Sequence, residues 1–459
     1  MTSSSTGEAA PSPATIRKVA LAACASSSIE WYDFFIYLTA AALIFPALFF
    51  PAEISETAAV LASLSTAAVG FVARPVGGAL FGHFGDKLGR KPTLVIALLV
   101  MGVATTLVGV MPTFATIGIL APILLFVLRF CQGLAVGGQW GGAVLLATEY
   151  APPGKRGFYG SFAQVGVPIG LVLGNASFLI LGALMSPEAF NAWGWRIPFL
   201  ASIVLIGLAL YIQLKLEETP AFRQLQEKQQ EDSADGTPQR SPLFEVFRDH
   251  WRQVLLAGGA FFVVNGAFYV MITGMLDYGT RDLGLERQTM LFAVLISSFA
   301  QIFFLTFWAA LSDRIGRRPV YLAGALLLGL WGFPMFWLVD TGSFLLITLA
   351  LTIGQLFLSM MYGPQAALFS EMFSARVRYS GASMGYQLAS VFAGGLAPTI
   401  MVSLLTYFET SLSVSFYILF MAAVTFISVY LITETFEGEM SEDMAKQEGA
   451  ATEGSVSAN

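Results

Sequence analysis

Two carboxylates and two guanidinium groups interrupt long apolar stretches of this chain, and groups of these types can bind anions and exchange protons. Glu30 and Asp33 are three positions apart, so a helix would place both on one face. Arg74 and Arg129 lie in two other apolar stretches. Burying such a group in a bilayer costs about 2.5–3.5 kcal/mol, which makes each one a candidate for a functional site. We expect one carboxylate to stay paired with Arg129 while the other exchanges a proton.

The sequence does not decide which of Glu30 and Asp33 carries the proton, and a permanent structural ion pair with Arg129 is the alternative interpretation. The variant Asp33→Asn separates the two. Lost proton-driven uptake with retained counterflow would indicate coupling, whereas loss of folded protein would indicate a structural pair. Arg129 is also a candidate contact for an anionic substrate, since a guanidinium offers a fork of donors to a carboxylate.

The composition indicates which elements must position these groups. Of the 459 residues, 56% are hydrophobic and only 12% are charged, against about 25% charged residues in a soluble domain. A helix crosses a bilayer with about 20 apolar residues. We therefore predict an all-α integral membrane protein with twelve transmembrane helices near residues 19–49, 58–82, 92–112, 116–147, 157–185, 197–216, 252–277, 288–311, 319–339, 343–370, 379–406 and 411–433.

The distribution of charge predicts an orientation and excludes several functions. Most of the 24 Lys and Arg residues fall in connections on one side, which by the positive-inside rule is the cytoplasm, so both termini are expected there. These bases are scattered, which excludes a nucleic-acid interface. The chain has no Walker phosphate loop and only two His residues. We expect no enzyme activity, no metal, no cofactor and a gradient as the energy source.

The second half of the chain repeats features of the first. The segment 82–92 is echoed by 309–319, and Glu149 and Arg156 recur as Glu371 and Arg378. Repeated halves with a binding site at their interface are typical of secondary transporters. The predicted organisation is a cytoplasmic N-terminal tail 1–18, a six-helix bundle 19–216, a central cytoplasmic loop 217–250, a second six-helix bundle 251–433 and an acidic cytoplasmic tail 434–459.

These repeated segments also carry a family resemblance over nearly the whole chain. Segments 82–92 and 309–319 are similar to the loop signature of the major facilitator superfamily. Four further segments resemble its bacterial metabolite:proton symporter branch, which includes shikimate, α-ketoglutarate and proline/betaine carriers: Glu30–Phe34, Arg129–Gly133, Gly137–Ala143 and Val377–Ser383. The sequence departs from the pattern in two places. Gln139 stands where the branch often has Glu, and Ala309 replaces the first Gly of the second loop.

The resemblance implies a proton-coupled symporter that imports a small metabolite by alternating access through a bacterial inner membrane. We expect an organic acid as substrate, because Arg129 is available in the core. The alternatives are an osmolyte symporter for proline or betaine, an uncoupled facilitator and a transporter-like sensor. The expected partners are the substrate, the proton and the lipid bilayer, with the chain acting as a monomer.

The resemblance also implies that the repeated loops brace the outward-open state and release when the cytoplasmic side opens. We expect Asp86 and Asp313 to accept bonds from nearby helix ends and arginines, and Gly89 and Gly316 to permit tight turns. The predicted gating residues are Gly82, Asp86, Gly89, Arg90, Lys91, Glu149, Arg156, Asp313, Gly316, Arg317, Arg318, Glu371 and Arg378.

Polar and aromatic residues in the remaining helices are candidates for lining a substrate cavity. An amide or phenol inside a membrane also bonds to neighbouring helices, so packing is the alternative role for each. The candidates are Tyr37, Arg74, Gln132, Gln139, Trp140, Gln164, Asn265, Tyr269, Gln355, Tyr362, Tyr386 and Gln387.

Overall fold

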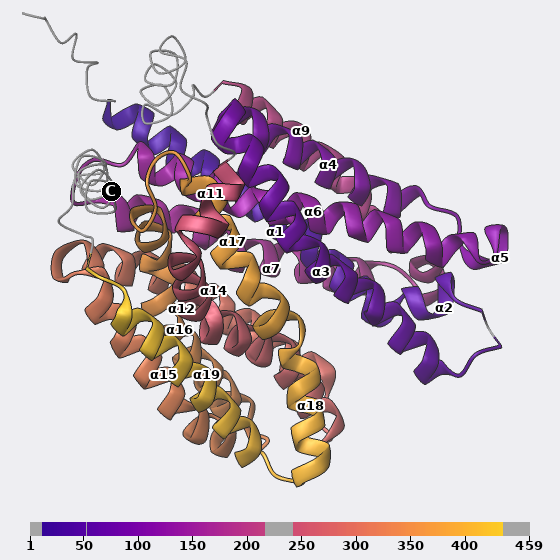
Figure 1. Cartoon of the computed structure of the whole chain (residues 1–459). Helices are drawn as coiled ribbons and strands as arrows, with labels where there is room; N and C mark the ends of the chain where they lie inside the picture. The colour runs from indigo at the N-terminus through magenta and orange to yellow at the C-terminus, as the bar shows by residue number, and fades with distance from the viewer. Residues whose placement is uncertain (1–11, 52, 216–241, 435–459) are drawn as a thin grey trace, which may run out of the picture.

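The computed structural model describes residues 12–51, 53–215 and 242–434, and this part of the chain contains helices and no strand. Figure 1 shows two helical bundles side by side, the first in indigo to magenta and the second in red to yellow. The first bundle comprises α1 (Pro13–Leu43), α2 (Phe45–Phe49), α3 (Glu56–Leu88), α4 (Arg90–Val110), α5 (Phe114–Ile117), α6 (Leu120–Glu149), α7 (Arg156–Leu184), α8 (Pro187–Ala189), the π-helical turn η1 (Phe190–Gly194) and α9 (Arg196–Leu214).

The second bundle follows the short helix α11 (Pro242–Asp249). It comprises α12 (Trp251–Tyr269), the π-helical turn η2 (Val270–Gly274), α13 (Met275–Arg281), α14 (Arg287–Ile315), α15 (Arg317–Val339), α16 (Phe344–Glu371), α17 (Arg378–Ala389), the π-helical turn η3 (Ser390–Gly395), α18 (Ala397–Phe408) and α19 (Leu412–Leu431). The π-helical turns join α12 to α13 and α17 to α18, so each pair forms one crossing.

The helices have the length and composition of membrane spans. In the described ranges, nine are long and apolar enough to cross a bilayer, and a tenth crossing is bent by 45° between Pro187–Gly194 and Arg196–Tyr211. Helices α1 and α3, of 31 and 33 residues, complete the first bundle. Their apolar character is interrupted by ionisable residues such as Glu30 and Arg74. The predicted all-α membrane fold is confirmed.

The structure corrects the prediction that the repeated segments are loops. Gly82 and Asp86 lie within α3, and Asp313 lies within α14, because both helices continue well past the apolar stretch. The turns themselves are single glycines, Gly89 with φ of 113° and Gly316 with φ of 100°. Only glycine adopts such angles without steric cost, so each glycine reverses the chain directly from one helix into the next.

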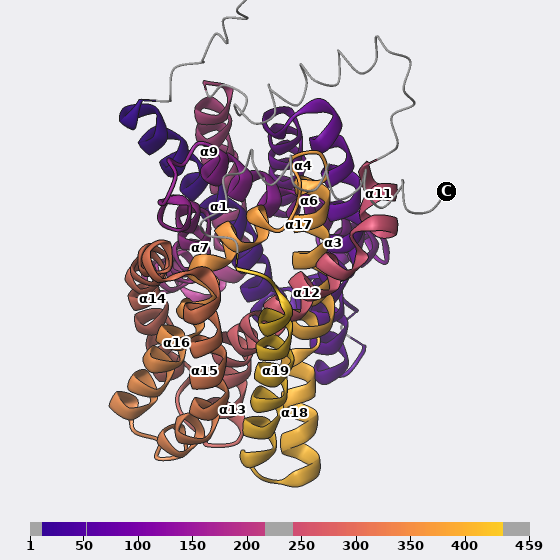
Figure 2. The ribbon, with the colours of Figure 1, turned by 60° about the vertical axis from the view of Figure 1, so that its left-hand side comes forward.

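The predicted connection 217–250 is also partly helical. Its last residues form α11, which packs against α3 and α17 and so touches both bundles (Figure 2). The predicted N-terminal tail 1–18 likewise ends in helix, since α1 begins at Pro13. Residues 1–11, most of the central connection (216–241) and all but the first residue of the acidic tail (435–459) lie outside the described ranges.

Both ends of the described chain lie, apart from one another, at the face of the molecule that also carries the turns between α3 and α4 and between α14 and α15 (Figure 1). We call this face the basic end, because most of the Lys and Arg residues lie there, and the other face the opposite end. The two bundles touch mainly along two seams. Helix α7 packs against α14 and α16, and α3 packs against α17. The candidate site residues lie along these seams and in the space between them.

Candidate functional site

The guanidinium groups of Arg74 on α3 and Arg129 on α6 are buried between the helices of the first bundle, each residue 1% exposed. Their Cζ atoms lie 4.6 Å and 4.8 Å from the centre of the Phe34 ring, so one aromatic side chain of α1 lies beside both charges. Gly70 makes room for this arrangement, since a Cβ atom there would lie only 2.7 Å from Arg129 Nε. The structure therefore brings together two cations that are far apart in the sequence.

Several donors of these two cations lack hydrogen-bond partners among the described residues. Arg129 Nη1 donates to Gln132 Oε1 at 3.2 Å. The Nε and Nη2 atoms of both Arg74 and Arg129, however, have no partner within the part of the chain that the structure describes. A buried donor without a partner costs about 1–3 kcal/mol. An anion that enters this region would satisfy several such donors at once.

Asp33 does not form the predicted ion pair with Arg129. It is fully buried, and its Oδ1 accepts a hydrogen bond of 2.5 Å from Ser202 Oγ on α9. Its Oδ2 has no partner among the described residues. The prediction was wrong because neither the tilt nor the rotation of α1 can be read from spacing. The partner that sequence reasoning missed, Ser202, had only one signal: a lone hydroxyl in an apolar helix.

Glu30 occupies a different environment from Asp33. It is 3% exposed, and its main attractive electrostatic interaction is with Arg74 rather than Arg129. Asp33 adds a weaker repulsion. The two carboxylates therefore interact, as their spacing predicts, but each also interacts with a different group: Asp33 with Ser202, and Glu30 with Arg74. Glu30 is therefore the carboxylate that is attracted to Arg74, whose Nε and Nη2 atoms have no partner in the described ranges.

An aromatic cluster lies between the bundles. The rings of Trp140 on α6 and Phe261 on α12 each stack on Tyr386 of α17 with centroids 4.0 Å apart. The hydroxyls of Tyr386 and Tyr362 lie 3.4 Å apart. A cavity of about 20 Å³ lies against this cluster, and Trp31 and Asn265 are also in its wall. Phe261 was missed by sequence reasoning, because a phenylalanine in an apolar helix gives no distinguishing signal.

Several predicted cavity residues instead join helices. Tyr37 bonds to Thr66 at 2.7 Å, and Gln132 donates to Thr105 at 2.8 Å, both inside the first bundle. These residues stabilise the packing of the bundle, which was the alternative role considered for them.

Two other amides cross from one bundle to the other. Gln164 Nε2 donates to the carbonyl of Tyr362 and Gln387 Nε2 to the carbonyl of Gly137, each at 3.2 Å. Trp140 Nε1 donates to Gln164 Oε1 at 2.8 Å and so links this contact to the aromatic cluster. Three further predicted residues are buried and carry side-chain polar atoms without a partner in the described ranges: Gln139, Tyr269 and Gln355.

At the basic end, the carboxylate of Asp86 binds the first turn of a helix in the other bundle, as expected from the sequence. It accepts hydrogen bonds from the backbone N–H of Tyr379 at 3.2 Å, the N–H of Ser380 at 3.0 Å and the hydroxyl of Ser380 at 2.6 Å. A carboxylate at a helix N-terminus is stabilised by the unpaired N–H groups and the helix dipole. Gly82 permits this approach, because a Cβ atom there would lie 2.8 Å from the Cα of Ser380.

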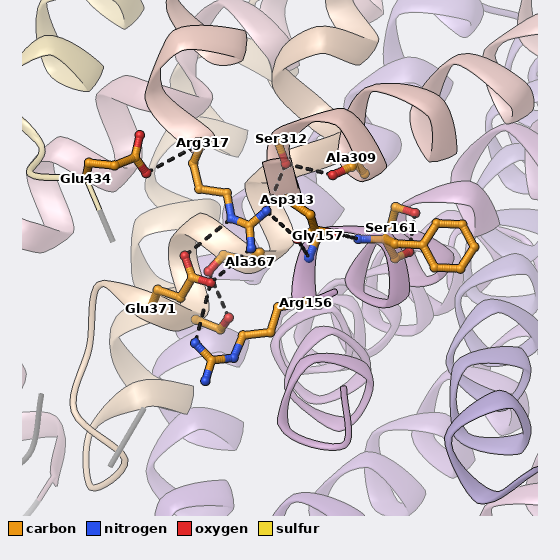
Figure 3. Close-up of polar contacts among 12 residues, drawn as sticks. Arg156, Gly157, Ser161, Ala309, Ser312, Asp313, Arg317, Ala367, Glu371 and Glu434 are labelled. Atoms are coloured by element: carbon orange, nitrogen blue, oxygen red, sulfur yellow. Dashed lines mark hydrogen bonds and ion pairs between the residues drawn. The ribbon is translucent and has the colours of Figure 1, made fainter. Parts of the chain in front are cut away.

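Asp313 makes the corresponding contact in the other direction (Figure 3). Its two oxygens accept bonds of 2.8 Å from the backbone N–H groups of Gly157 and Phe158 at the start of α7. Arg317 also donates to Asp313 at 2.6 Å. Each bundle therefore holds the N-terminus of a helix in its partner, and the two contacts are related by the internal repeat.

Two glutamates at the basic end add charge pairs across the same seams. Glu149 lies 3.6 Å from Arg90 of its own bundle and 3.3 Å from Arg378 of the other. Glu371 repeats this pattern with Arg317 at 3.2 Å and Arg156 at 3.8 Å, as Figure 3 shows. Two predicted gating residues at the neighbouring helix starts instead donate bonds within their own bundles: Lys91 to the carbonyl of Leu214 at 3.0 Å, and Arg318 to that of Tyr430 at 2.6 Å.

A further cavity lies between the bundles at the opposite end. It has a volume of about 270 Å³ and lies between α1 and α7 on one side and α13 and α14 on the other. Its wall includes Phe35 and Leu171, each one helical turn beyond Trp31 and Val167 of the small central cavity. The structure thus combines ion pairs that join the two bundles at the basic end with a cavity between the bundles at the opposite end.

Comparison with known proteins accounts for this architecture. The family model "Sugar (and other) transporter" matches residues 19–446. The chain belongs to this family. The protein of Escherichia coli (strain K12) called inner membrane metabolite transport protein YhjE is 40% identical over 423 residues, which cover 91% of this chain and 94% of that protein. The shikimate transporter of the same strain is 40% identical over 412 residues, covering 88% and 91%.

Among solved structures, the major facilitator superfamily proton:xylose symporter XylE bound to 6-bromo-6-deoxy-D-glucose is similar with a TM-score of 0.75. Its sequence is 18% identical, and the match covers 94% of this chain and 99% of that one. The chain is therefore a metabolite transporter of the major facilitator superfamily and not an enzyme.

Proposed function

We propose that the protein is a proton-coupled symporter that imports a small organic acid by alternating access. The observation that supports an anionic substrate is the pair of buried guanidinium groups with unpaired donors, on Arg74 and Arg129. A carboxylate matches the planar fork of a guanidinium and forms charge-assisted hydrogen bonds with it. Asp33 is engaged by Ser202, so Glu30 is the carboxylate that competes with a substrate for Arg74.

This competition supplies a mechanism for coupling. When Glu30 is ionised, its attraction to Arg74 opposes the binding of a second carboxylate. A proton on Glu30 removes that negative charge, so that Arg74 is available to bind the carboxylate of the substrate. Proton and organic acid therefore bind cooperatively, and each enters the site more readily when the other is present. The proton gradient provides the energy, with no bound cofactor.

We propose that the basic end faces the cytoplasm of a bacterial inner membrane, with both termini on that side and the chain acting as a monomer. The excess of Lys and Arg in the connections at this end supports the orientation. In this orientation the structure is the state that is closed to the cytoplasm. Asp86 and Asp313 hold the seams shut, and they release the helix N-termini when the cavity opens inward.

Uptake into proteoliposomes tests the coupling. Wild-type protein is expected to accumulate a labelled organic acid when the outside is acidic, and a protonophore should abolish accumulation. Glu30→Gln should lose accumulation and keep counterflow exchange. Asp340→Asn is the matched control, because Asp340 bonds to Tyr278 and Ser411 within the second bundle. Accumulation without a gradient, or accumulation that survives loss of both Glu30 and Asp33, would overturn the proposal.

A counterflow panel identifies the substrate class, with shikimate, α-ketoglutarate, benzoates, proline and betaine as labelled solutes. Exchange of acids alone is the expected result. Exchange of only the zwitterions would contradict the role given to Arg74 and Arg129. Membrane-impermeant maleimide tests the orientation in intact cells: Ser186→Cys at the opposite end should react, and Thr15→Cys at the basic end should not. Both positions are exposed.

A further inference from the structure

A cavity of about 440 Å³ opens between the two bundles at the basic end, away from the transport site. It lies where α7 begins and α14 ends. Phe158 and Tyr159 form one wall, and Phe307 and Leu311 form the other. Charged groups from both bundles also line the cavity, so its surface is partly apolar and partly polar.

The free charge around this cavity is positive. Lys155 and Arg314 both line it and are exposed, and neither side chain has a hydrogen bond or ion pair among the described residues. The lining carboxylate, Asp313, is already engaged by two backbone N–H groups of α7 and by Arg317. Within the described ranges, the lining of this cavity therefore offers two unpaired cations and no free carboxylate.

The outer face of α14 leads directly to this cavity. Large apolar side chains at positions three or four apart are 47% to 60% exposed along it: Phe292, Ile296, Phe299, Phe303 and Phe307. In a membrane-spanning helix such a stripe faces lipid acyl chains. The stripe reaches the cavity at Phe307 and is followed two turns later by Arg314. An apolar stripe followed by a positive charge thus matches the order of acyl chain and anionic phosphate in a phospholipid.

We propose that this cavity binds the headgroup of an anionic phospholipid, with the phosphate between Lys155 and Arg314 and an acyl chain along the exposed face of α14. The lipid contacts α7 of one bundle and α14 of the other, beside the Asp313 contact. It therefore stabilises the state in which the basic end is closed. This site is separate from the substrate site, and its occupancy does not depend on the substrate or on proton coupling.

The related seam between α3 and α17 does not offer the same site. The residues that correspond to Arg314 and Lys155 in the repeat are Lys87 and Val377, so one of the two cations is absent. Helix α11 also packs against α3 and α17 and covers this seam, with Glu245 bonded to Arg376 at 3.1 Å. The asymmetry provides an internal control for the proposal.

Native mass spectrometry of the purified full chain tests the site. The detergent-solubilised protein is titrated with dioleoyl phosphatidylglycerol and, separately, with zwitterionic dioleoyl phosphatidylcholine. The expected result is a one-to-one complex with phosphatidylglycerol that withstands detergent exchange, and much weaker retention of phosphatidylcholine. The double variant Lys155→Gln/Arg314→Gln should bind phosphatidylglycerol about 20-fold more weakly, because each base near a membrane surface contributes to attraction of anionic lipid.

Two further variants make the result specific. Lys18→Gln/Lys87→Gln removes the same charge from exposed positions at the basic end and should keep the wild-type affinity. Lys155→Arg/Arg314→Lys keeps the charge and should also bind. Size-exclusion profiles and unfolding temperatures like those of the wild type verify folding of each variant. Equal retention of phosphatidylglycerol by wild type and Lys155→Gln/Arg314→Gln, or equal retention of the two lipids, would overturn the proposal.

Discussion

Replacing Asp313 with Asn should open the basic end, because this carboxylate holds two N–H groups of the other bundle. The bonds to Gly157 and Phe158 are each 2.8 Å long, and the Asp313 side chain is only 5% exposed. Asparagine has one acceptor oxygen, so one of these N–H groups loses its partner. Arg317 keeps its bond to Glu371 at 3.2 Å, so the substitution should disturb the packing within the second bundle only slightly.

The size of the effect follows from that loss. A hydrogen bond to a charged group contributes about 1.5–3 kcal/mol. If the closed state alone loses about 2 kcal/mol, the ratio of open to closed molecules rises about 30-fold, since 1.4 kcal/mol corresponds to a factor of ten. Asp86→Asn should act in the same direction at the other seam, where the carboxylate accepts three bonds.

Thiol labelling measures this ratio. Ala366 is fully buried at the contact of α16 with α7, where a Cβ atom at Gly160 would lie 3.1 Å from the Ala366 Cβ. In a Cys24→Ser/Cys131→Ser background, Ala366→Cys should react with maleimide only when the basic end opens. Its labelling rate should rise about 30-fold with Asp313→Asn, in proportion to the open population.

Two controls show whether faster labelling reports opening of the basic end. Asp340→Asn removes a carboxylate whose bonds lie within one bundle and should leave the labelling rate unchanged. A second reporter, Ala350→Cys, is fully buried inside the second bundle and should stay unreactive, which separates opening from unfolding. A labelling rate for Asp313→Asn within twofold of its parent would refute the conclusion that the contact of Asp313 with the start of α7 holds the basic end closed.

Three other outcomes are expected. Gly316→Ala should lower the free energy of unfolding by about 1–3 kcal/mol, because φ of 100° and ψ of 157° are strained for any residue with a Cβ. Thermal unfolding measures this loss of stability. Gly207→Ala is the neutral control, because a Cβ atom at Gly207 meets nothing within 4 Å. Ser202→Ala should cost about 1.5–3 kcal/mol in denaturant unfolding, since Asp33 loses its hydrogen bond. Arg74→Gln should reduce organic-acid uptake at least tenfold while the purified protein stays folded, and unchanged uptake would remove Arg74 from the site.

The sequence predicted the helices and the repeat because both are local properties. A long apolar stretch needs only the bilayer as its environment, so hydropathy and length suffice to place it. The predicted helix ends are wrong where a helix continues beyond its apolar residues, as in α3, which continues to Leu88. The charged residues that join the bundles at the basic end were also predictable as a group, since Glu149 and Glu371, like Asp86 and Asp313, recur with the repeat.

The tertiary structure decided which group each buried charge contacts. Spacing places Glu30 and Asp33 near one another, but the tilt and rotation of α1 against its neighbours set their partners. Asp33 bonds to Ser202, 169 positions away, and Arg129 bonds to Gln132 rather than to a carboxylate. Such contacts depend on the relative rotation of packed helices, which is a property of whole surfaces and has no signature in any one stretch of sequence.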